Sequence, residues 1–420
     1  MAWLLFTAGV VFGVLTLHSF RPLRWPGSFV LGAWISSWLV IELPLHLLAA
    51  QVTTAALVTA AGGIEHWPGF VGLGLTALSG VGLVRHFSVA RRTHEHVEGA
   101  LVQTLGADYR ADIVPKLRRK FKDAMPWFRL ARVFPIRRGD VERISNLRYA
   151  DEDNRRLELD IYRHRGRPTG SPILLYTHGG GWVIGNKAQQ GLVTVNHMAS
   201  RGWLCVSINY RLSPRATFPD HLLDLKRAIK WVRENAEQYG GDPSFIVLAG
   251  GSAGAHLSAL AALTPNAAEY QRDFPDVDTT VQGCVAYYGV YDFTDRYGHW
   301  PHNMFRMMLE KAIMKRRLAD APEEYAKASP IDRLGNHAPP FLMFHGTRDN
   351  LAPVGDARKF AEAFRERTGA PVAYVELPGA QHAFELFPSV RSLQVINGVE
   401  RFCAAAYSKH LVSSDEQAQT

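Results

Sequence analysis

The first 86 residues consist mainly of apolar runs separated by short polar segments. Residues 2–20 are almost wholly apolar, residues 28–50 form a second run, and residues 70–84 form a third that can extend back to Ile64. A helix needs about 20 mostly apolar residues to cross the hydrocarbon layer of a bilayer. The pattern therefore predicts a transmembrane region of about three helices over residues 1–86.

The charges that flank these runs predict their orientation. Arg21 and Arg24 lie between the first two runs, and Arg85, Arg91 and Arg92 follow the third. Because Lys and Arg gather in cytoplasmic loops, we expect a multi-pass membrane protein with its N-terminus outside and the large domain that follows the apolar runs in the cytoplasm. A cleaved signal peptide fits the first run less well, since no basic residue precedes it and no small-residue cleavage site is clear.

An acidic residue lies inside the second apolar run. Glu42 and His46 are four residues apart, hence on one face of a helix, with Pro44 between them. A carboxylate within a membrane is costly and is by default a candidate for function. We expect a structural role instead, in which Pro44 kinks the helix or Glu42 meets water or a neighbouring helix near the membrane edge.

From residue 146 onward, short apolar segments alternate with helical patterns. Residues 147–150 and 157–162 predict an antiparallel hairpin that turns at 151–154. Helical runs such as 218–239 separate the later segments, which indicates an α/β domain whose mainly parallel sheet is covered on both faces. Six strands are predicted for that part, at 173–177, 204–209, 246–249, 285–288, 341–344 and 372–377.

Residues 87–145 hold most of the excess positive charge. The chain has 47 Lys plus Arg against 39 Asp plus Glu, a net charge of +8. The segment from Pro115 to Arg143 contains ten basic and three acidic residues. Interleaved aromatic residues make this segment amphipathic, which is typical of a helical connector on an anionic lipid surface. A solvated helical face is an equal alternative, and no recognition motif favours nucleic acid. The α/β domain is then expected over 146–412, followed by a disordered tail at 413–420.

The cysteines give no sign of a disulfide framework or a metal site. Cys205, Cys284 and Cys403 are odd in number and lie in predicted strand or helix interiors. We expect buried free thiols, no metal and no organic cofactor.

A glycine-rich turn carries the clearest candidate chemistry. The sequence Gly250-Gly251-Ser252-Ala253-Gly254 follows the apolar run 245–248 and precedes the alanine-rich helical run 255–263. A strand, a tight turn and a helix in this order expose a serine hydroxyl, because glycine permits a strained backbone and close packing. The amide of Ala253, at the helix start, points where an oxyanion would form. An ordinary strand-to-helix turn is the alternative for this motif taken alone.

Three further segments follow predicted strands in the order that this chemistry needs. His178-Gly179-Gly180-Gly181-Trp182 follows the first parallel strand, so that the amides of Gly180 and Gly181 can join that of Ala253 as oxyanion donors. Later strands lead to Asp349 and then to His382. The order Ser252, Asp349, His382 predicts a nucleophile, an acid and a base that meet at the carboxyl ends of the strands.

Six segments of the second part of the chain carry a family resemblance. They are His178-Gly-Gly-Gly-Trp182, Ile208-Asn-Tyr-Arg-Leu-Ser-Pro214, Phe218-Pro-Asp220, Gly250-Gly-Ser-Ala-Gly254, His345-Gly-Thr-Arg-Asp349 and Gln381-His382. From about Arg148, the chain resembles an α/β-hydrolase of the carboxylesterase kind related to hormone-sensitive lipase. Those esterases usually have Asp before the serine, where this chain has Gly251. The Trp after the glycines and the run Ser252-Ala-Gly-Ala-His-Leu257 also resemble the corresponding segments of arylformamidases and isoprenylcysteine methylesterases, which leaves the acyl substrate open.

In this interpretation, His382 removes the proton of Ser252 as it attacks, and Asp349 orients the imidazole. Residues 291–336, which are irregular and rich in Met, are expected to form a helical lid over the site, although a helix packed on the sheet would have the same composition. Alternatives for the acid and base are Asp292, His345 and His256.

The sequence thus predicts a membrane-anchored serine carboxylic-ester hydrolase that acts through an acyl-enzyme on short to medium acyl or lipid-like esters. The first alternative hydrolyses an arylformamide or an isoprenylcysteine methyl ester, and the second is a non-catalytic membrane scaffold. The expected partners are an ester or lipid-like small molecule and membrane lipids, with no nucleic acid, and self-association into a homo-oligomer stays open.

Overall fold

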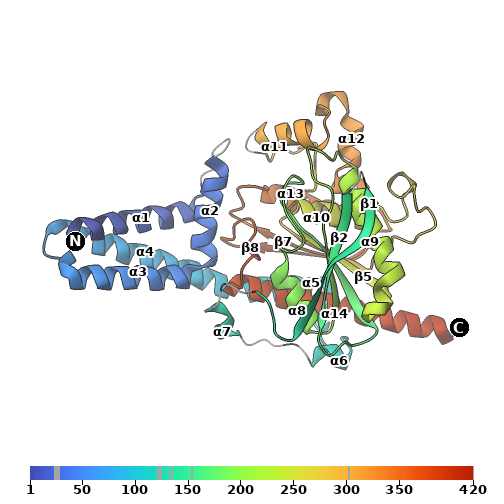
Figure 1. The fold of residues 1–420 in the computed structure, drawn as a ribbon, viewed down its shortest axis with the longest axis horizontal. Coiled ribbons are helices and arrows are strands. Elements are labelled where there is room, and N and C mark those ends of the chain that lie inside the picture. Colours follow the sequence, from blue (N-terminus) through green and yellow to red (C-terminus); the bar gives the residue numbers. More distant parts are fainter. Residues whose placement is uncertain are drawn as a thin grey trace.

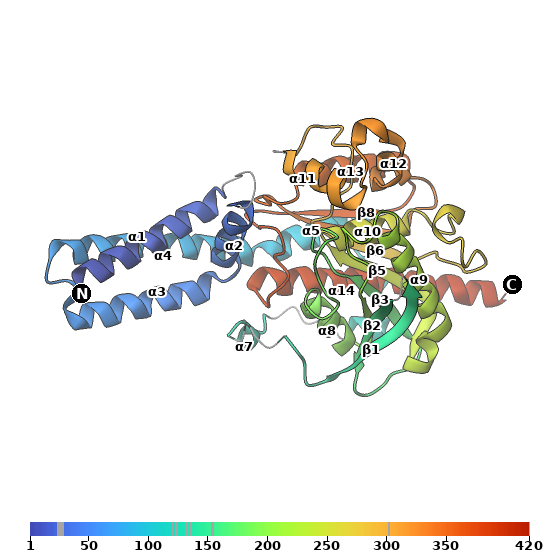
Figure 2. The same ribbon diagram turned by 45° about the horizontal axis from the view of Figure 1, so that its top comes forward.

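The structure is a computed structural model that describes the whole chain except residues 23–28, 120, 122–124, 132, 134–135, 153–154, 301–302 and 420. A bundle of helices projects from an α/β domain built on one eight-stranded sheet (Figures 1 and 2). The N-terminus lies at the far end of this bundle, away from the α/β domain.

The sheet has the strand order β1-β2-β4-β3-β5-β6-β7-β8. Its first two strands form the predicted antiparallel hairpin at one edge, β2 pairs antiparallel with β4, and every later pair is parallel. The hairpin and the six further strands predicted from sequence are therefore confirmed, although hairpin residues 153–154 lie outside the described part. The strands are β1 (Val141–Glu152), β2 (Arg155–His164), β3 (Ser171–Thr177), β4 (Leu204–Ile208), β5 (Gly241–Gly251), β6 (Gly283–Tyr287), β7 (Phe341–Gly346) and β8 (Val372–Leu377).

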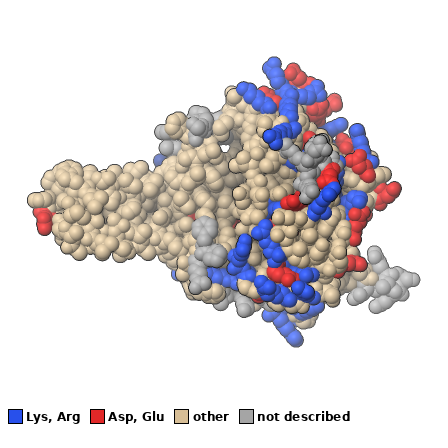
Figure 3. All heavy atoms as spheres, in the orientation of Figure 1, with Lys and Arg blue, Asp and Glu red and all other residues tan. Residues whose placement is uncertain are grey.

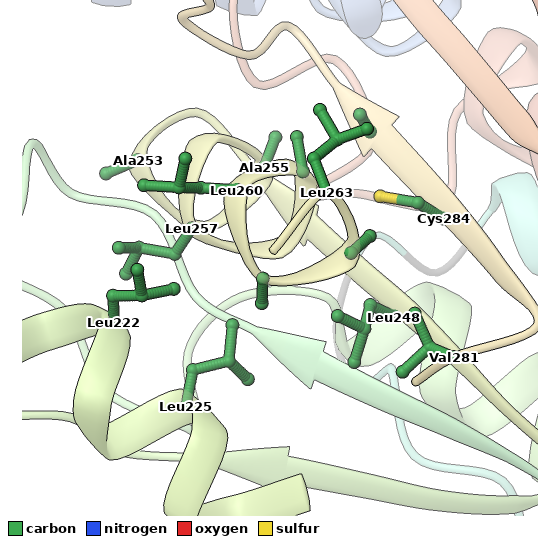
Figure 4. Close-up of a cluster of buried hydrophobic side chains, with 14 of the residues drawn as sticks. Leu222, Leu225, Leu248, Ala253, Ala255, Leu257, Leu260, Leu263, Val281 and Cys284 are labelled. Atoms are coloured by element: carbon green, nitrogen blue, oxygen red, sulfur yellow. The ribbon is translucent and has the colours of Figure 1, made fainter. Parts of the chain in front are cut away.

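Helices cover both faces of the sheet because successive residues of each buried strand point to opposite sides. Ile246 and Leu248 of β5 belong to one apolar core, whereas Val247 and Ala249 belong to the other. Figure 4 shows the first core, where leucines of two helices meet Leu248. Its helices are α9 (Asp220–Asn235), α10 (Ala253–Ala262) and α13 (Val354–Arg367), and the other face carries α5 (Thr93–Leu105), α8 (Leu192–Ser200) and α14 (Val390–Gln419).

Three long apolar helices form the projecting bundle, namely α1 (Ala2–Phe20), α3 (Pro44–Val58) and α4 (Trp67–Arg91). Glycine lets α1 and α4 approach closely, since a Cβ atom on Gly72 would lie 2.4 Å from the carbonyl oxygen of Leu5. By length and composition, the stretches Ala2–Phe20, Pro44–Gly63 and Trp67–Leu105 could each cross a membrane.

The second apolar run is not one helix, so that prediction from sequence is wrong. It divides into α2 (Phe29–Glu42) and α3, which begins at Pro44. Proline has no amide hydrogen to continue the hydrogen-bond ladder of the preceding helix, so the chain turns there. As a result, α2 leaves the bundle axis and lies at the junction with the α/β domain (Figures 1 and 2).

Glu42 has the structural role expected of it. Its carboxylate accepts hydrogen bonds from Arg391 Nε at 3.0 Å and from Ser389 Oγ at 2.9 Å, and all three residues are buried. A buried carboxylate is tolerable when it is paired and hydrogen-bonded in this way. The contact ties the end of α2 to the start of α14.

The described residues between Leu105 and β1 are mostly irregular, so the expectation of a mostly helical connector is wrong for them. Gly106 has a φ of +101°, which ends α5, and in the described part of the connector two short helices follow, α6 (Pro115–Arg118) and α7 (Trp127–Leu130). The predicted disordered tail is also wrong, because α14 continues to Gln419 in the described chain.

Residues 291–336 form a separate group of short helices beside the carboxyl ends of the strands (orange in Figures 1 and 2). They include α11 (Asn303–Met308) and α12 (Pro322–Lys327). The remaining short helical turns within the described residues are Thr59–Gly63, Ala236–Tyr239, Ala268–Tyr270, Leu309–Ile313, Leu318–Asp320 and Pro330–Arg333.

Candidate active site

Ser252 lies at a strained turn between β5 and α10. Its backbone has a φ of +55° and a ψ of −120°, a conformation that non-glycine residues rarely adopt. Glycines make the turn feasible, since a Cβ atom on Gly254 would lie 2.1 Å from the carbonyl oxygen of Thr177. The Ser252 amide donates to the carbonyl of Tyr287 at 2.9 Å, which fixes the turn to the neighbouring strand. The serine side chain is thereby held at the carboxyl ends of the strands.

The glycine loop after β3 packs directly against this turn. A Cβ atom on Gly179 would lie 3.1 Å from Ser252 Cβ. Gly180 and Gly181 follow with φ values of +112° and +60°, which suit residues without a side chain. Their amides and that of Ala253 donate in none of the hydrogen bonds recorded between described residues. Three free N–H groups therefore border the serine, as an oxyanion site requires.

Asp349 and His382 are in direct contact. Asp349 Oδ2 lies 2.7 Å from His382 Nδ1, and Asp349 Oδ1 accepts from the amides of Leu351 and Ala352 at 2.9 and 2.8 Å. Burial alone would raise the pKa of Asp349, but the charge of His382 and the hydrogen bonds from His345 and His382 outweigh it and lower that pKa. Asp349 is therefore an ionised hydrogen-bonding partner of His382.

Ser252 and His382 meet through a shared neighbour. Among the recorded hydrogen bonds of the described residues, none involves Ser252 Oγ, a common feature of sites without bound substrate. The ring of Tyr288 lies 4.3 Å from the His382 ring, and its hydroxyl is 2.8 Å from the position of a Cβ atom on Gly251, the residue before Ser252. Tyr288 thus brings the serine turn and the histidine loop to the same place.

Comparison with known proteins gives the family. A family model described as BD-FAE matches residues 159–364. Over 410 residues, which are 95% of this chain and 92% of the relative, the sequence is 38% identical to the probable carboxylic ester hydrolase LipM of Mycobacterium tuberculosis. The chain belongs to the α/β-hydrolase family of carboxylic ester hydrolases.

Two further comparisons agree with this family. An esterase of Thermogutta terrifontis, solved with butyrate bound, has a TM-score of 0.51 and 28% identity, and the match covers 66% of this chain and 93% of that one. The isoprenylcysteine α-carbonyl methylesterase of Arabidopsis thaliana is 30% identical over 242 residues, or 56% of this chain and 55% of the relative. The protein is therefore a carboxylesterase by family and by fold.

The structure accounts for the departure of this carboxylesterase from the usual Asp before the serine. A Cβ atom on Gly251 would lie 2.8 Å from Tyr288 Oη, so the tyrosine occupies the space of a side chain there. Tyr288 Oη in turn donates to Glu385 Oε1, and Tyr176 Oη lies 3.5 Å from the same oxygen. This buried carboxyl group could not be predicted from the sequence, because nothing in the spacing of Glu385 indicates contact with a tyrosine 97 positions earlier.

The other Glu385 oxygen is buried and has no hydrogen-bond partner among the described residues, which costs less free energy for a neutral acid than for a carboxylate. Burial raises the pKa of Glu385 to about 7 from an ordinary value of 4.5, and hydrogen bonds only partly oppose it. Between pH 4.5 and 7, Glu385 therefore holds a proton in the folded state that it releases in the unfolded state. Stability from the neutral acid is complete below pH 4.5 and is lost as the pH rises through 7.

Glu385→Gln should reduce this pH dependence. The pKa difference corresponds to about 3 kcal/mol of stability between pH 4.5 and 8. Thermal denaturation of the full chain in detergent at pH 5 and pH 8 measures it, and the wild type should lose more stability than the variant. Glu362→Gln, on the exposed side of α13, is the control and should keep the wild-type trend. Equal losses in wild type and Glu385→Gln would contradict the prediction.

The alternative acid and bases have other partners. Asp292 accepts from Arg296 and Thr294, and His256 Nε2 lies 2.7 Å from the carbonyl oxygen of Ala328. His345 Nε2 lies 3.3 Å from Asp349 Oδ2, so it supports the carboxylate beside His382. The structure thus brings His345, but not Asp292, to the Asp349 carboxylate.

The Met-rich insertion reaches the glycine loop. Met308 of α11 lies 3.7 Å from the position of a Cβ atom on Gly181, and Phe305 packs near the Trp182 ring at 6.2 Å between centroids. Met304 and Met307 of the same helix are exposed, as is Ile184 beside the loop. These apolar side chains give the surroundings of the site a hydrophobic character. The described residues contain no group of three or more His, Cys, Asp or Glu side chains that could hold a metal ion.

Proposed function

We propose that this carboxylesterase is a serine hydrolase with Ser252 as nucleophile, His382 as general base and Asp349 as its orienting acid. The contact of Asp349 with His382 Nδ1, next to a strained serine turn, carries this proposal. With Nδ1–H donated to the aspartate, the Nε2 atom is left to take the serine proton.

The reaction follows from these positions. Ser252 Oγ attacks the ester carbonyl carbon while its proton passes to His382 Nε2, which then gives the proton to the leaving alcohol. Negative charge on the carbonyl oxygen is stabilised by the amides of Gly180, Gly181 and Ala253. A water molecule activated by His382 then hydrolyses the acyl-enzyme, which releases the acid and restores the serine.

Labelling of the nucleophile tests this assignment. A fluorophosphonate probe should modify Ser252 in the full-length protein, as peptide mass spectrometry would show. Boiled protein should take up no label, because reaction requires the folded arrangement of base and oxyanion donors. A label on another serine, or none on the native protein, would contradict the assignment.

For the substrate, we propose short to medium acyl esters or lipid-like esters. Support comes from the apolar side chains around the glycine loop and from the related Thermogutta esterase solved with butyrate. The similarity to an isoprenylcysteine methylesterase favours a methyl ester of a lipidated thioether as the second candidate. Rates for p-nitrophenyl esters of increasing chain length, an isoprenylcysteine methyl ester and an arylformamide would distinguish these classes.

We also propose that the bundle of α1, α3 and α4 anchors the enzyme in a membrane. Three apolar spans would place the N-terminus and the α/β domain on opposite sides, and basic residues favour a cytoplasmic position of the domain. In Figure 3 the projecting bundle has almost no charged atoms on the visible face, whereas charged residues of both signs lie over the α/β domain. Protease should remove a C-terminal tag in inside-out vesicles but not in right-side-out vesicles.

The side of the domain near α7 suits contact with anionic headgroups. Trp127 and Phe128 are exposed, and a cavity of 380 Å³ beside them is lined by Arg129, Arg137 and Arg138, among other residues. Burial, and then the charge of Arg138, lower the pKa of Arg129. An anion beside these guanidinium groups would offset their repulsion. We therefore propose membrane lipids as partners of this surface.

A further inference from the structure

Helix α2 is in direct contact with the loop that carries His382. The indole Nε1 of Trp34 donates to the carbonyl oxygen of His382 at 3.0 Å. Four residues later, the indole Nε1 of Trp38 donates to the carbonyl oxygen of Ala383 at 2.9 Å. Two side chains from the N-terminal region therefore hold the backbone of the histidine and of the next residue.

The loop itself is in a conformation that needs outside support. Ala383 has a φ of +62°, in the left-handed region that residues with a side chain seldom adopt. Gln381 adds a third contact to the same helix, because its Nε2 donates to Ser37 Oγ at 3.1 Å. Its Oε1 accepts from the His382 amide at 2.8 Å, so the glutamine joins α2 to the histidine backbone from the other side.

The helix is fixed firmly enough to serve as a support. The Trp38 ring stacks on Phe387 at 4.7 Å, and Glu42, one turn further along α2, forms the buried pair with Arg391. Trp34, Trp38 and Glu42 are spaced by four residues and lie on one helix face. That face therefore contacts the chain from His382 to Arg391.

A similar contact supports the acid. Arg348, the residue before Asp349, donates from Nη1 to the carbonyl oxygen of Ser19 at 3.1 Å, at the end of α1. Its guanidinium also lies 5.1 Å from the centre of the Phe20 ring. Both loops that supply the Asp349–His382 pair thus rest on the N-terminal helices.

We propose that Trp34 and Trp38 are positioning residues, so that α2 is a structural part of the active site and not only a link to an anchor. The proposal rests on the serine mechanism proposed above. Loss of the indole donors would let the strained loop relax and move the imidazole relative to Ser252 and Asp349. Displacements of this kind reduce the rate of the chemical step more than they weaken the binding of substrate.

The test uses the full-length protein in detergent micelles, with a p-nitrophenyl ester as substrate. Trp34→Phe, Trp38→Phe and the double variant keep an aromatic ring but remove the N–H donors. Trp67→Phe is the matched control, because Trp67 is exposed near the far end of the bundle and its ring contacts the rings of Trp3 and Phe6. The double variant should lose at least about tenfold in kcat, with KM within about twofold of wild type.

The pH profile separates a positioning role from a general loss of folding. With a weaker hold on the loop, Asp349 stabilises the imidazolium less, so the low-pH limb of kcat/KM should move to lower pH in the double variant. Trp67→Phe should keep the wild-type profile. If Trp38→Phe lowers both the melting temperature and the amount of folded protein, Trp34→Phe decides, since it removes a single donor from a partly exposed ring.

Wild-type kcat and an unchanged pH profile in the folded double variant would overturn the proposal. A rise in KM at constant kcat would also overturn it, because α2 would then act on binding. Fluorophosphonate labelling of wild-type Ser252 is read separately: no label contradicts the serine mechanism, whereas a labelled wild type with fully active tryptophan variants contradicts only the role of α2.

Discussion

Ser252→Ala should lower kcat/KM for a p-nitrophenyl ester by about 10⁴- to 10⁶-fold. The substitution removes only the hydroxyl oxygen and keeps the Cβ atom, so the backbone strain of the turn, where φ is +55°, is the same in the variant. The amide contact to the carbonyl of Tyr287 does not involve the side chain and should persist. Without Oγ no acyl-enzyme can form, and the free amides of the glycine loop are left to act on a water reaction alone.

Steady-state kinetics and circular dichroism of the purified full-length variant measure this effect. Ser244→Ala, near the start of the same strand β5, is the control, because its hydroxyl bonds to Asp242 far from the strand end. It should keep wild-type activity. Hydrolysis by Ser252→Ala at more than about 1% of the wild-type rate would show that another group is the nucleophile.

Asp349→Asn should lower kcat by about 10⁴-fold with little change in overall shape. An amide can offer its NH₂ group to His382 Nδ1, which favours the tautomer that cannot accept the serine proton on Nε2. The Asn side chain also fails to stabilise the imidazolium that forms as Ser252 attacks. Because the pKa of Asp349 is held below its ordinary value, the wild-type carboxylate is ionised and its contribution to the rate is present across the neutral range.

Asp292→Asn distinguishes the two carboxylates that follow strand ends. Asp292 is held by Arg296 and by the amide of Thr294, so its replacement should lower the melting temperature while kcat stays within about tenfold of wild type. A ranking in the opposite order, with Asp292→Asn inactive and Asp349→Asn active, would transfer the acid role to Asp292.

Much of the α/β domain could be predicted because its strands are buried on both faces. Segments such as 173–177 and 341–344 are continuous apolar runs, and the glycine turn around Ser252 has few other uses between a strand and a helix. Once the order along the chain was known, the carboxyl ends of parallel strands had to bring Asp349 and His382 to one edge. Local pattern and sheet geometry were sufficient for this part.

Contacts between segments far apart in the chain could not be predicted from local pattern and sheet geometry. Tyr288 fills the space that a side chain at position 251 would take, and its hydroxyl contacts the buried Glu385. Both contacts depend on packing between the end of β6 and the loop that carries His382. Pro44 predicted a kink in the second apolar run, but only the structure shows that the run divides there into two helices. A run of apolar residues has the same hydropathy whether it faces lipid or protein.

The sequence by itself determined where the strands lie along the chain, the turn that presents Ser252, and the residues available to act with it, because each depends on near neighbours in the chain. Only the tertiary structure decided that α2 lies against the loop of His382, with Trp34 and Trp38 bonded to carbonyl groups more than 340 residues away. Those carbonyl groups belong to every residue alike, so no pattern of side chains along the chain marks them as partners.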